Sequence, residues 1–307
     1  MRNTNIYLKH RKVLKISGVN SIHFLNNILT TDITKLKRNE VYPCALLSPQ
    51  GRILFDMLVS LSNLENSMNN NSIYIEHDKE HQDELIKRLQ IYNLRKEVII
   101  EKTNYGVLVT TENSDYTHTL SDKRFFNDRL KRVYIECLSE TESFDSNDNK
   151  NINWYDLLRY KNCIIEGSKE IETNVSLPLE TNLDLLGGIS FEKGCFIGQE
   201  VNARIKWKGL VKRKYVPFSL KNEKFLHLKL SELDNKKIFL ENKEIGEIIS
   251  LSHDNKDKIF YGIAKITLSY LYRFEEDQSL EGNFFDTKIR INFPKYMLPL
   301  PKKTRIS

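Results

Sequence analysis

Residues 193–204 read KGCFIGQEVNAR and carry the most informative pattern in the chain. Cys195 stands between Gly194 and Gly198, and a helix-like run follows. Glycines this close together let the backbone approach another group and leave amide N–H groups exposed where a helix begins. A thiol beside Lys193 at such a helix start can be nucleophilic, oxidisable or metal-binding. A cysteine in a tight turn can equally be a small buried side chain, so both interpretations stay open.

Upstream of this stretch, the sequence predicts a mixture of strands and helices. Two apolar runs flank a Ser-Pro-Gln-Gly turn at 48–51, which predicts a hairpin. Ser17-Gly18 separates a short alternating run from a stretch with apolar residues on one helical face. The predicted strands are 12–16, 44–47, 53–59, 73–76, 98–101 and 105–110, and the predicted helices are 22–29, 83–92 and 154–160.

Downstream of Lys214, short β-like runs alternate with polar turns, which is typical of a small β-barrel or sandwich. The runs are 215–220, 237–240, 245–251, 259–266 and 287–291. We therefore expect an α+β fold with a mixed α/β N-terminal region built on antiparallel sheets and a small C-terminal β-barrel. The expected domains are residues 1–212, with two interwoven subdomains, and residues 213–307.

Composition limits the class of protein. The chain has 307 residues, a formal net charge of +6 and four cysteines. The cysteines are far apart and form no CxxC pair, so neither a disulfide framework nor a zinc site is indicated, and a reducing compartment is expected. No apolar run is long enough to cross a membrane. His77 and His81 are four residues apart but are expected at the surface, and no metal ligands are predicted.

The N-terminal residues bear on location. Five cations precede the first acid, Asp32, which superficially resembles a mitochondrial leader. The strand-like residues 13–16 leave barely eleven residues for such a leader, however. A cytoplasmic location is therefore expected, with the mitochondrial matrix as the alternative.

KGCFIGQEVNAR resembles the signature of the YgfZ family and its mitochondrial counterpart, which reads K-G-C, an aromatic residue, any residue, G-Q-E, and A-R after two more positions. Residues 24–32 resemble the family's opening helix and residues 47–52 its hairpin. The family is related to the glycine-cleavage T-protein. The resemblance implies a T-protein-like cloverleaf that binds tetrahydrofolate in a central channel and supports iron–sulfur cluster assembly.

The resemblance also implies site residues. Residues 177–183 resemble the stretch in which T-protein relatives hold the pterin ring, which makes Glu180 the pterin candidate. One carboxylate can accept paired hydrogen bonds from the amino group and ring N–H of a pterin. The alternative for Glu180 is an exposed loop acid after Pro178. Arg159 falls at another superfamily position, although the residues after it depart from the expected pattern. Cys195 is the expected catalytic residue, and the other cofactor-binding candidates are Lys193, Gly194, Gln199, Glu200 and Arg204.

A basic tract follows the signature. It contains no acid and includes Trp207; its cations are Arg204, Lys206, Lys208, Lys212, Arg213 and Lys214. Such a tract can hold a polyglutamate tail or make weak contact with RNA phosphates, or it can simply be a solvated surface.

The expected function is therefore that of a tetrahydrofolate-binding accessory factor for assembly or repair of iron–sulfur clusters. Its expected partners are folate, client proteins that include tRNA-modifying enzymes, and assembly machinery. Cys195 would ligate a cluster transiently, exchange disulfides or take a one-carbon unit. Two alternatives remain. An aminomethyltransferase would need an acid that the sequence does not locate, and a non-enzymatic RNA-linked scaffold would bind through the basic tract.

Overall fold

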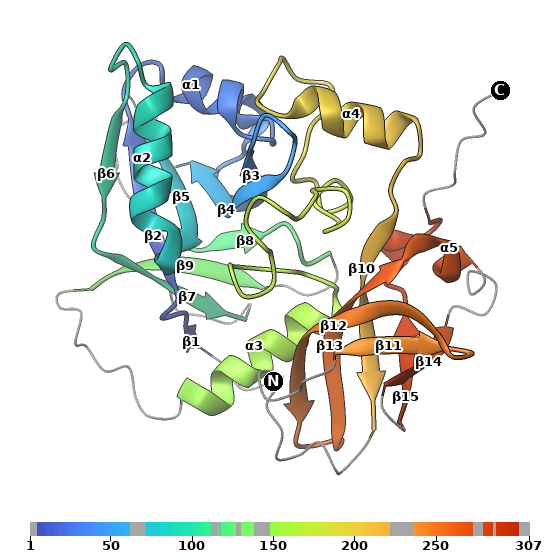
Figure 1. Cartoon of the computed structure of the whole chain (residues 1–307). Helices are drawn as coiled ribbons and strands as arrows, with labels where there is room; N and C mark the ends of the chain where they lie inside the picture. The colour runs from blue at the N-terminus through green and yellow to red at the C-terminus, as the bar shows by residue number, and fades with distance from the viewer. Residues whose placement is uncertain are drawn as a thin grey trace. The chain divides into compact units, whose positions relative to one another are not determined.

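In the computed structural model of the chain, structure is described for residues 5–61, 72–111, 116, 118–126, 130–137, 148–221, 236–272, 279–284 and 287–300 (Figure 1). The chain divides into two compact units. The first takes in 1–152, 166–178 and 186–202, and the second 153–165, 179–185 and 203–307. The expected domain boundary after residue 212 stays a prediction. No helix in the described ranges is long and apolar enough to cross a membrane.

The first unit is built on a nine-stranded sheet with the strand order β1-β7-β9-β8-β3-β4-β5-β2-β6. β3 and β8 pair in parallel and the other neighbours are antiparallel, so the sheet is mixed rather than antiparallel throughout. The strands are β1 (Ile6–Tyr7), β2 (Arg11–Ser17), β3 (Glu40–Leu47), β4 (Ile53–Leu61), β5 (Ile73–Asp78), β6 (Ile99–Lys102), β7 (Tyr105–Thr110), β8 (Leu120–Asp122) and β9 (Lys131–Glu136).

Two helices of the first unit follow the apolar spacing in the sequence. α1 (Ser21–Ile28) buries Leu25 and Ile28, and α2 (Gln82–Tyr92) buries Leu85 and Leu89. These side chains lie three or four positions apart, on one face of each helix, and belong to one apolar cluster with side chains of β2, β3, β4 and β5. The predicted helices and the 48–51 hairpin are confirmed.

The second unit contains a closed barrel with the strand order β10-β13-β12-β11-β14-β15, which confirms the predicted C-terminal barrel. Its strands are β10 (Arg213–Leu220), β11 (Lys237–Leu240), β12 (Lys243–Asp254), β13 (Ile259–Thr267), β14 (Ser279–Phe284) and β15 (Thr287–Asn292). The other α-helices in the described ranges are α3 (Asp148–Lys161), α4 (Gln199–Trp207) and α5 (Leu268–Leu271).

The surface position predicted for His77 is wrong. His77 lies on β5, a strand whose residues are all buried, and its Nδ1 is 2.8 Å from the carbonyl oxygen of Asp78. Burial, helped by the nearby charge of Arg11, lowers the pKa of His77 to about 4, although the hydrogen bond with the Asp78 carbonyl opposes the shift. His77 is therefore a neutral core residue at pH 7.

We expect the replacement His77→Asn to make the protein less sensitive to acid. Because the folded-state pKa is lowered, protons bind preferentially to the unfolded state as pH falls from 6.5 to about 4. Over that window the preferential protonation of His77 in the unfolded state should lower the free energy of unfolding by about 3 kcal/mol. Urea unfolding at several pH values measures this, with the exposed His23→Asn as the control. Equal acid sensitivity in both variants would contradict the prediction.

Candidate functional site

Lys193 fixes the start of the KGCFIGQE segment to the end of α1. Its Nζ donates to the carbonyl oxygens of Asn26 at 2.6 Å, Leu29 at 2.5 Å and Thr31 at 2.8 Å. The last carbonyls of a helix lack intrahelical partners and carry partial negative charge, which favours a cation there. Desolvation lowers the pKa of Lys193 to about 8, so the ammonium remains mostly charged at pH 7. Its predicted folate contact would compete with these three carbonyls and stays a prediction.

Gly198 packs against the turn of the β3–β4 hairpin. Its φ is +77°, and a Cβ there would lie 2.6 Å from the carbonyl oxygen of Ser48 and 2.9 Å from the Cα of Gly51. Asn202 closes the contact, because its Nδ2 donates to the carbonyls of Gly51 at 2.8 Å and Gly198 at 3.0 Å. No other residue fits at position 198 without displacing the hairpin.

The three segments that carry the family resemblance therefore lie in contact within the first unit. Lys193 joins the signature to residues 24–32, and Gly198 joins it to residues 47–52. Thr30 adds another link, because its hydroxyl donates to the carbonyl of Gly188 at 2.6 Å and accepts from the amide of Ala45 at 2.8 Å. The loop that holds Cys195 is thus fixed on both sides.

Cys195 is exposed and free, which excludes the buried, inert interpretation. Cys44 and Cys163 are buried and Cys137 is partly buried. Burial raises the pKa of the Cys44 thiol well above its usual range. Of the four cysteines, Cys195 is the one that is exposed.

The other signature residues have different environments. Gln199, the first residue of α4, accepts a hydrogen bond from the amide of Phe196 on its Oε1 at 3.3 Å and so stabilises the turn before the helix. Gly194, Glu200 and Arg204 are exposed. The cofactor-binding roles predicted for these residues stay predictions.

In the second unit, Glu180 is buried, which excludes the exposed loop acid considered from the sequence. Its Oε1 lies 3.7 Å from Nε of the half-exposed Arg213. Its backbone is held as well, because its carbonyl accepts from the amide of Tyr215 at 3.0 Å. Lys214 is buried and donates to the carbonyl of Leu179 at 2.7 Å, so it is not part of a solvated basic surface.

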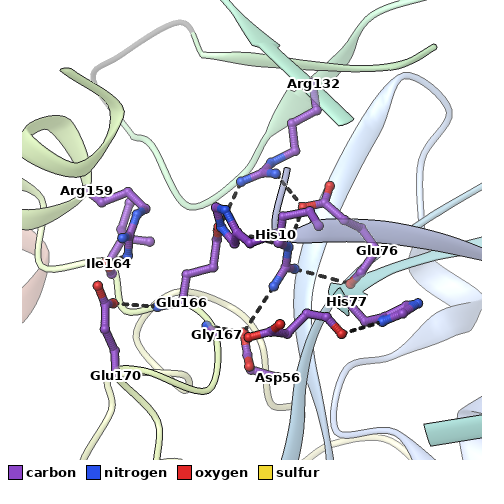
Figure 2. Close-up of polar contacts among 12 residues, drawn as sticks. His10, Asp56, Glu76, His77, Arg132, Arg159, Ile164, Glu166, Gly167 and Glu170 are labelled. Carbon is purple, nitrogen blue, oxygen red and sulfur yellow. Dashed lines mark hydrogen bonds and ion pairs between the residues drawn. The ribbon is translucent and has the colours of Figure 1, made fainter. Parts of the chain in front are cut away.

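Arg159 is a buried residue at the end of α3. Its guanidinium donates to the carbonyl of Ile164 at 3.2 Å (Figure 2). It also donates to Asp156 at 2.7 Å. The same group lies over the rings of Tyr155 and Tyr160, 5.4 and 5.2 Å from their centroids. These contacts give Arg159 a structural role in the second unit.

A buried network of charges in the first unit was not predicted from the sequence. It consists of three arginines and three carboxylates, so its formal charges balance; the members are Arg11, Arg124, Arg132, Glu76, Asp122 and Glu166. Arg132 links all three acids, with Nη1 2.5 Å from Glu76, Nε 2.9 Å from Asp122 and Nη2 3.1 Å from Glu166. Figure 2 shows Arg132, Glu76 and Glu166 converging.

The arginines of the network lower the pKa values of Asp122 and Glu166. Burial alone would raise the pKa of Glu166, but the guanidiniums of Arg11, Arg124 and Arg132 together outweigh burial and hold that pKa well below its usual range. The less buried Asp56 lies at the edge of the network, 3.6 Å from Arg11, and accepts from the amide of Gly167 at 3.0 Å. Among the described residues, no group of three or more His, Cys, Asp or Glu is placed to hold a metal ion.

A comparison with protein-family models found no match. Among curated proteins, the chain is 27% identical over 231 residues to one from Neurospora crassa, 29% over 225 residues to one from Mycosarcoma maydis and 26% over 253 residues to one from Dictyostelium discoideum. Each is named iron-sulfur cluster assembly factor IBA57 homolog, mitochondrial. The chain is similar in sequence to these assembly factors.

Each alignment covers 68% of this chain but only 52%, 55% and 61% of the respective relatives. The chain therefore spans little more than half the length of the curated relatives it matches. Among solved structures, it resembles the glycine cleavage system aminomethyltransferase T from Bartonella henselae with a TM-score of 0.69. That match covers 96% of this chain and 86% of the other at 11% identity. The predicted T-protein fold is confirmed.

Proposed function

We propose that this chain is a tetrahydrofolate-binding accessory factor for the assembly or repair of iron–sulfur clusters, with Cys195 as its reactive residue. The observation that carries the proposal is the exposed thiol on a loop fixed by Lys193 and Gly198. A fixed, accessible thiol suits transient ligation, because its position does not have to be ordered when the partner arrives. The names of the relatives support the same class of function.

Glu180 is the proposed pterin-binding residue. A buried carboxylate is costly unless it is paired, and the 3.7 Å separation from Arg213 is longer than a hydrogen bond. A pterin would offer Glu180 an amino group and a ring N–H in the geometry that a carboxylate accepts. The remaining cofactor-binding candidates are Lys193, Gly194, Gln199, Glu200 and Arg204.

We expect Glu180→Ala to weaken tetrahydrofolate binding at least about tenfold, because the paired charge-assisted hydrogen bonds would be lost. Calorimetric titration of the purified full chain under reducing conditions measures this. Glu244→Ala removes a carboxylate from the exposed Lys237–Glu244 pair of the barrel and is the matched control. Unchanged affinity in the Glu180 variant would mean that the pocket is misplaced. No binding by the unaltered chain would favour the scaffold alternative.

The alternatives have less support. Aminomethyl transfer needs an acid that activates the folate nitrogen. The likeness to the Bartonella protein concerns the fold alone, and the accepting oxygen of Asp56, the acid at the edge of the network, already faces an arginine and an amide. An RNA-linked scaffold would rely on the basic tract, of which Lys214 is buried and Arg213 lies beside Glu180.

The proposed compartment follows the relatives. Their names place them in mitochondria, which favours the mitochondrial matrix over the cytoplasm for this chain. The proposed partners are client enzymes, including those of tRNA modification, and assembly machinery. Imaging of the tagged protein in its own cells beside a matrix marker tests the compartment.

A further inference from the structure

The C-terminal end of α4 has a fixed geometry. Gly209 has a φ of +59°, its amide donates to the carbonyl of Lys206 at 3.2 Å, and the amide of Leu210 donates to the carbonyl of Ile205 at 2.9 Å. This pair of hydrogen bonds is the Schellman arrangement that ends many helices. It fixes the backbone on either side of Gly209.

Two large apolar side chains lie at this helix end and face solvent. Trp207 is 67% exposed and Leu210 is 41% exposed. The ammonium of Lys206 lies 5.4 Å from the centre of the Trp207 ring. Tryptophan has few rotatable bonds and a large apolar area, and it is enriched among the dominant residues of protein interfaces.

The charged residues that neighbour Trp207 and Leu210 in the sequence are all basic. Arg204, Lys208 and Lys212 are exposed, and none of them forms an ion pair with another described residue. Arg204 and Lys208 are four positions apart and therefore share a helix face. Residues 201–221 contain no Asp or Glu. We call Arg204, Trp207, Lys208, Leu210 and Lys212 the α4 cap patch.

We propose that the α4 cap patch docks an acidic protein surface that inserts an apolar side chain against Trp207 and Leu210, on the protein that exchanges clusters with this chain. The proposal rests on the proposed function. The charge of the patch selects an acidic partner, because its three exposed cations attract acidic surfaces and repel basic ones. The apolar centre supplies the area that a partner can desolvate.

The chemistry of the patch favours protein over RNA. Affinity for RNA grows with the number of phosphates neutralised, and three exposed cations allow few such contacts. Lys214 is buried and does not extend the basic surface, and Glu180 at 3.7 Å partly offsets the charge of the half-exposed Arg213. Leu210 offers an aliphatic side chain, which packs against another apolar side chain rather than stacking on a base.

Trp207 can report its own burial. The chain has two tryptophans, and Trp154→Phe leaves Trp207 as the single one. The probe is a synthetic helical peptide with two leucines flanked by glutamates, and its sibling carries lysines in place of the glutamates. We expect a saturable blue shift of Trp207 emission with the acidic peptide and none with the basic one. In the Lys208→Glu and Lys212→Glu double variant, binding should weaken at least about tenfold.

Lys243→Glu with Lys256→Glu makes the same change in net charge at exposed sites on the barrel, and it should leave peptide binding unchanged. The absence of a saturable shift, or an equal loss in this control, would overturn the proposal. Tighter binding of an oligouridylate RNA than of the acidic peptide, lost in the Lys208 and Lys212 variant, would also overturn it.

Cell assays separate this proposal from the function it rests on. Support of iron–sulfur enzymes should fall in the Lys208 and Lys212 double variant while its tetrahydrofolate affinity stays unchanged. If Cys195→Ser abolishes support but the double variant retains it fully, docking at the patch is wrong and the proposed function stands. If both variants retain full support, both proposals fail.

Discussion

Replacing Arg132 by methionine should lower the free energy of unfolding by about 3–5 kcal/mol, the range for removing one partner of a buried ion pair. Arg132 is fully buried and bonds Glu76, Asp122 and Glu166. Methionine fills much of the same space but donates no hydrogen bond. The three carboxylates would then have two guanidiniums among them, and one negative charge would be left in the core without compensation.

Urea unfolding followed by far-ultraviolet circular dichroism measures the effect. The matched control is Arg95→Met, because Arg95 is an exposed arginine whose ion pair with Glu97 is open to solvent. Exposed pairs contribute little, so the control should unfold at nearly the same urea concentration as the unaltered protein. Equal midpoints for the two variants would mean that the network does not stabilise the first unit.

The apolar strands and helices were predictable because the spacing of their apolar residues indicates which face is buried. β7 was predicted with its observed bounds, and β11 likewise, because each is a short run rich in apolar and β-branched residues between turn signals. The signature was also informative, since the close packing at Gly198 and the hydrogen bond from Phe196 to the side chain of Gln199 both depend on residue type.

The charged strands were not predictable by the same rule. β9 places Arg132 at a buried position, and β8 places Asp122 at one. A rule that expects apolar residues at buried positions therefore does not recognise these strands. Arg132 lies 56 positions from Glu76 and 34 from Glu166, and nothing local in the sequence pairs residues at such distances. The signal that was available is a charge inside an otherwise apolar run, which predicts burial only if a partner exists.

The candidate site was predictable in part. The sequence identified Cys195 and Glu180 as candidates. In the structure Cys195 is exposed and Glu180 is buried. The anchoring role of Lys193 was not foreseen, because the three carbonyls that it contacts come from a segment more than 160 positions away. Backbone carbonyls carry no residue signature, so a lysine that binds them looks like any other cation in the sequence.

Cys195→Ser should abolish support of iron–sulfur enzymes in cells that depend on this protein, because serine keeps the size of the side chain and removes the thiolate that ligates metal or attacks a disulfide. The readout is the activity of an iron–sulfur enzyme relative to a cluster-free enzyme in the same extract. Activity should fall to that of cells lacking the factor. Cys137→Ser, at a partly buried thiol, is the matched control and should retain full support.

The purified protein then distinguishes the three chemistries proposed for Cys195. Transient ligation predicts visible absorption after cluster loading that Cys195→Ser loses. Disulfide exchange predicts a mixed disulfide that a reductant reverses, and capture of a one-carbon unit predicts an adduct mass that appears only with a folate donor. Full enzyme support by Cys195→Ser would contradict all three, because each needs a thiol at this position and the buried Cys44 and Cys163 cannot replace it.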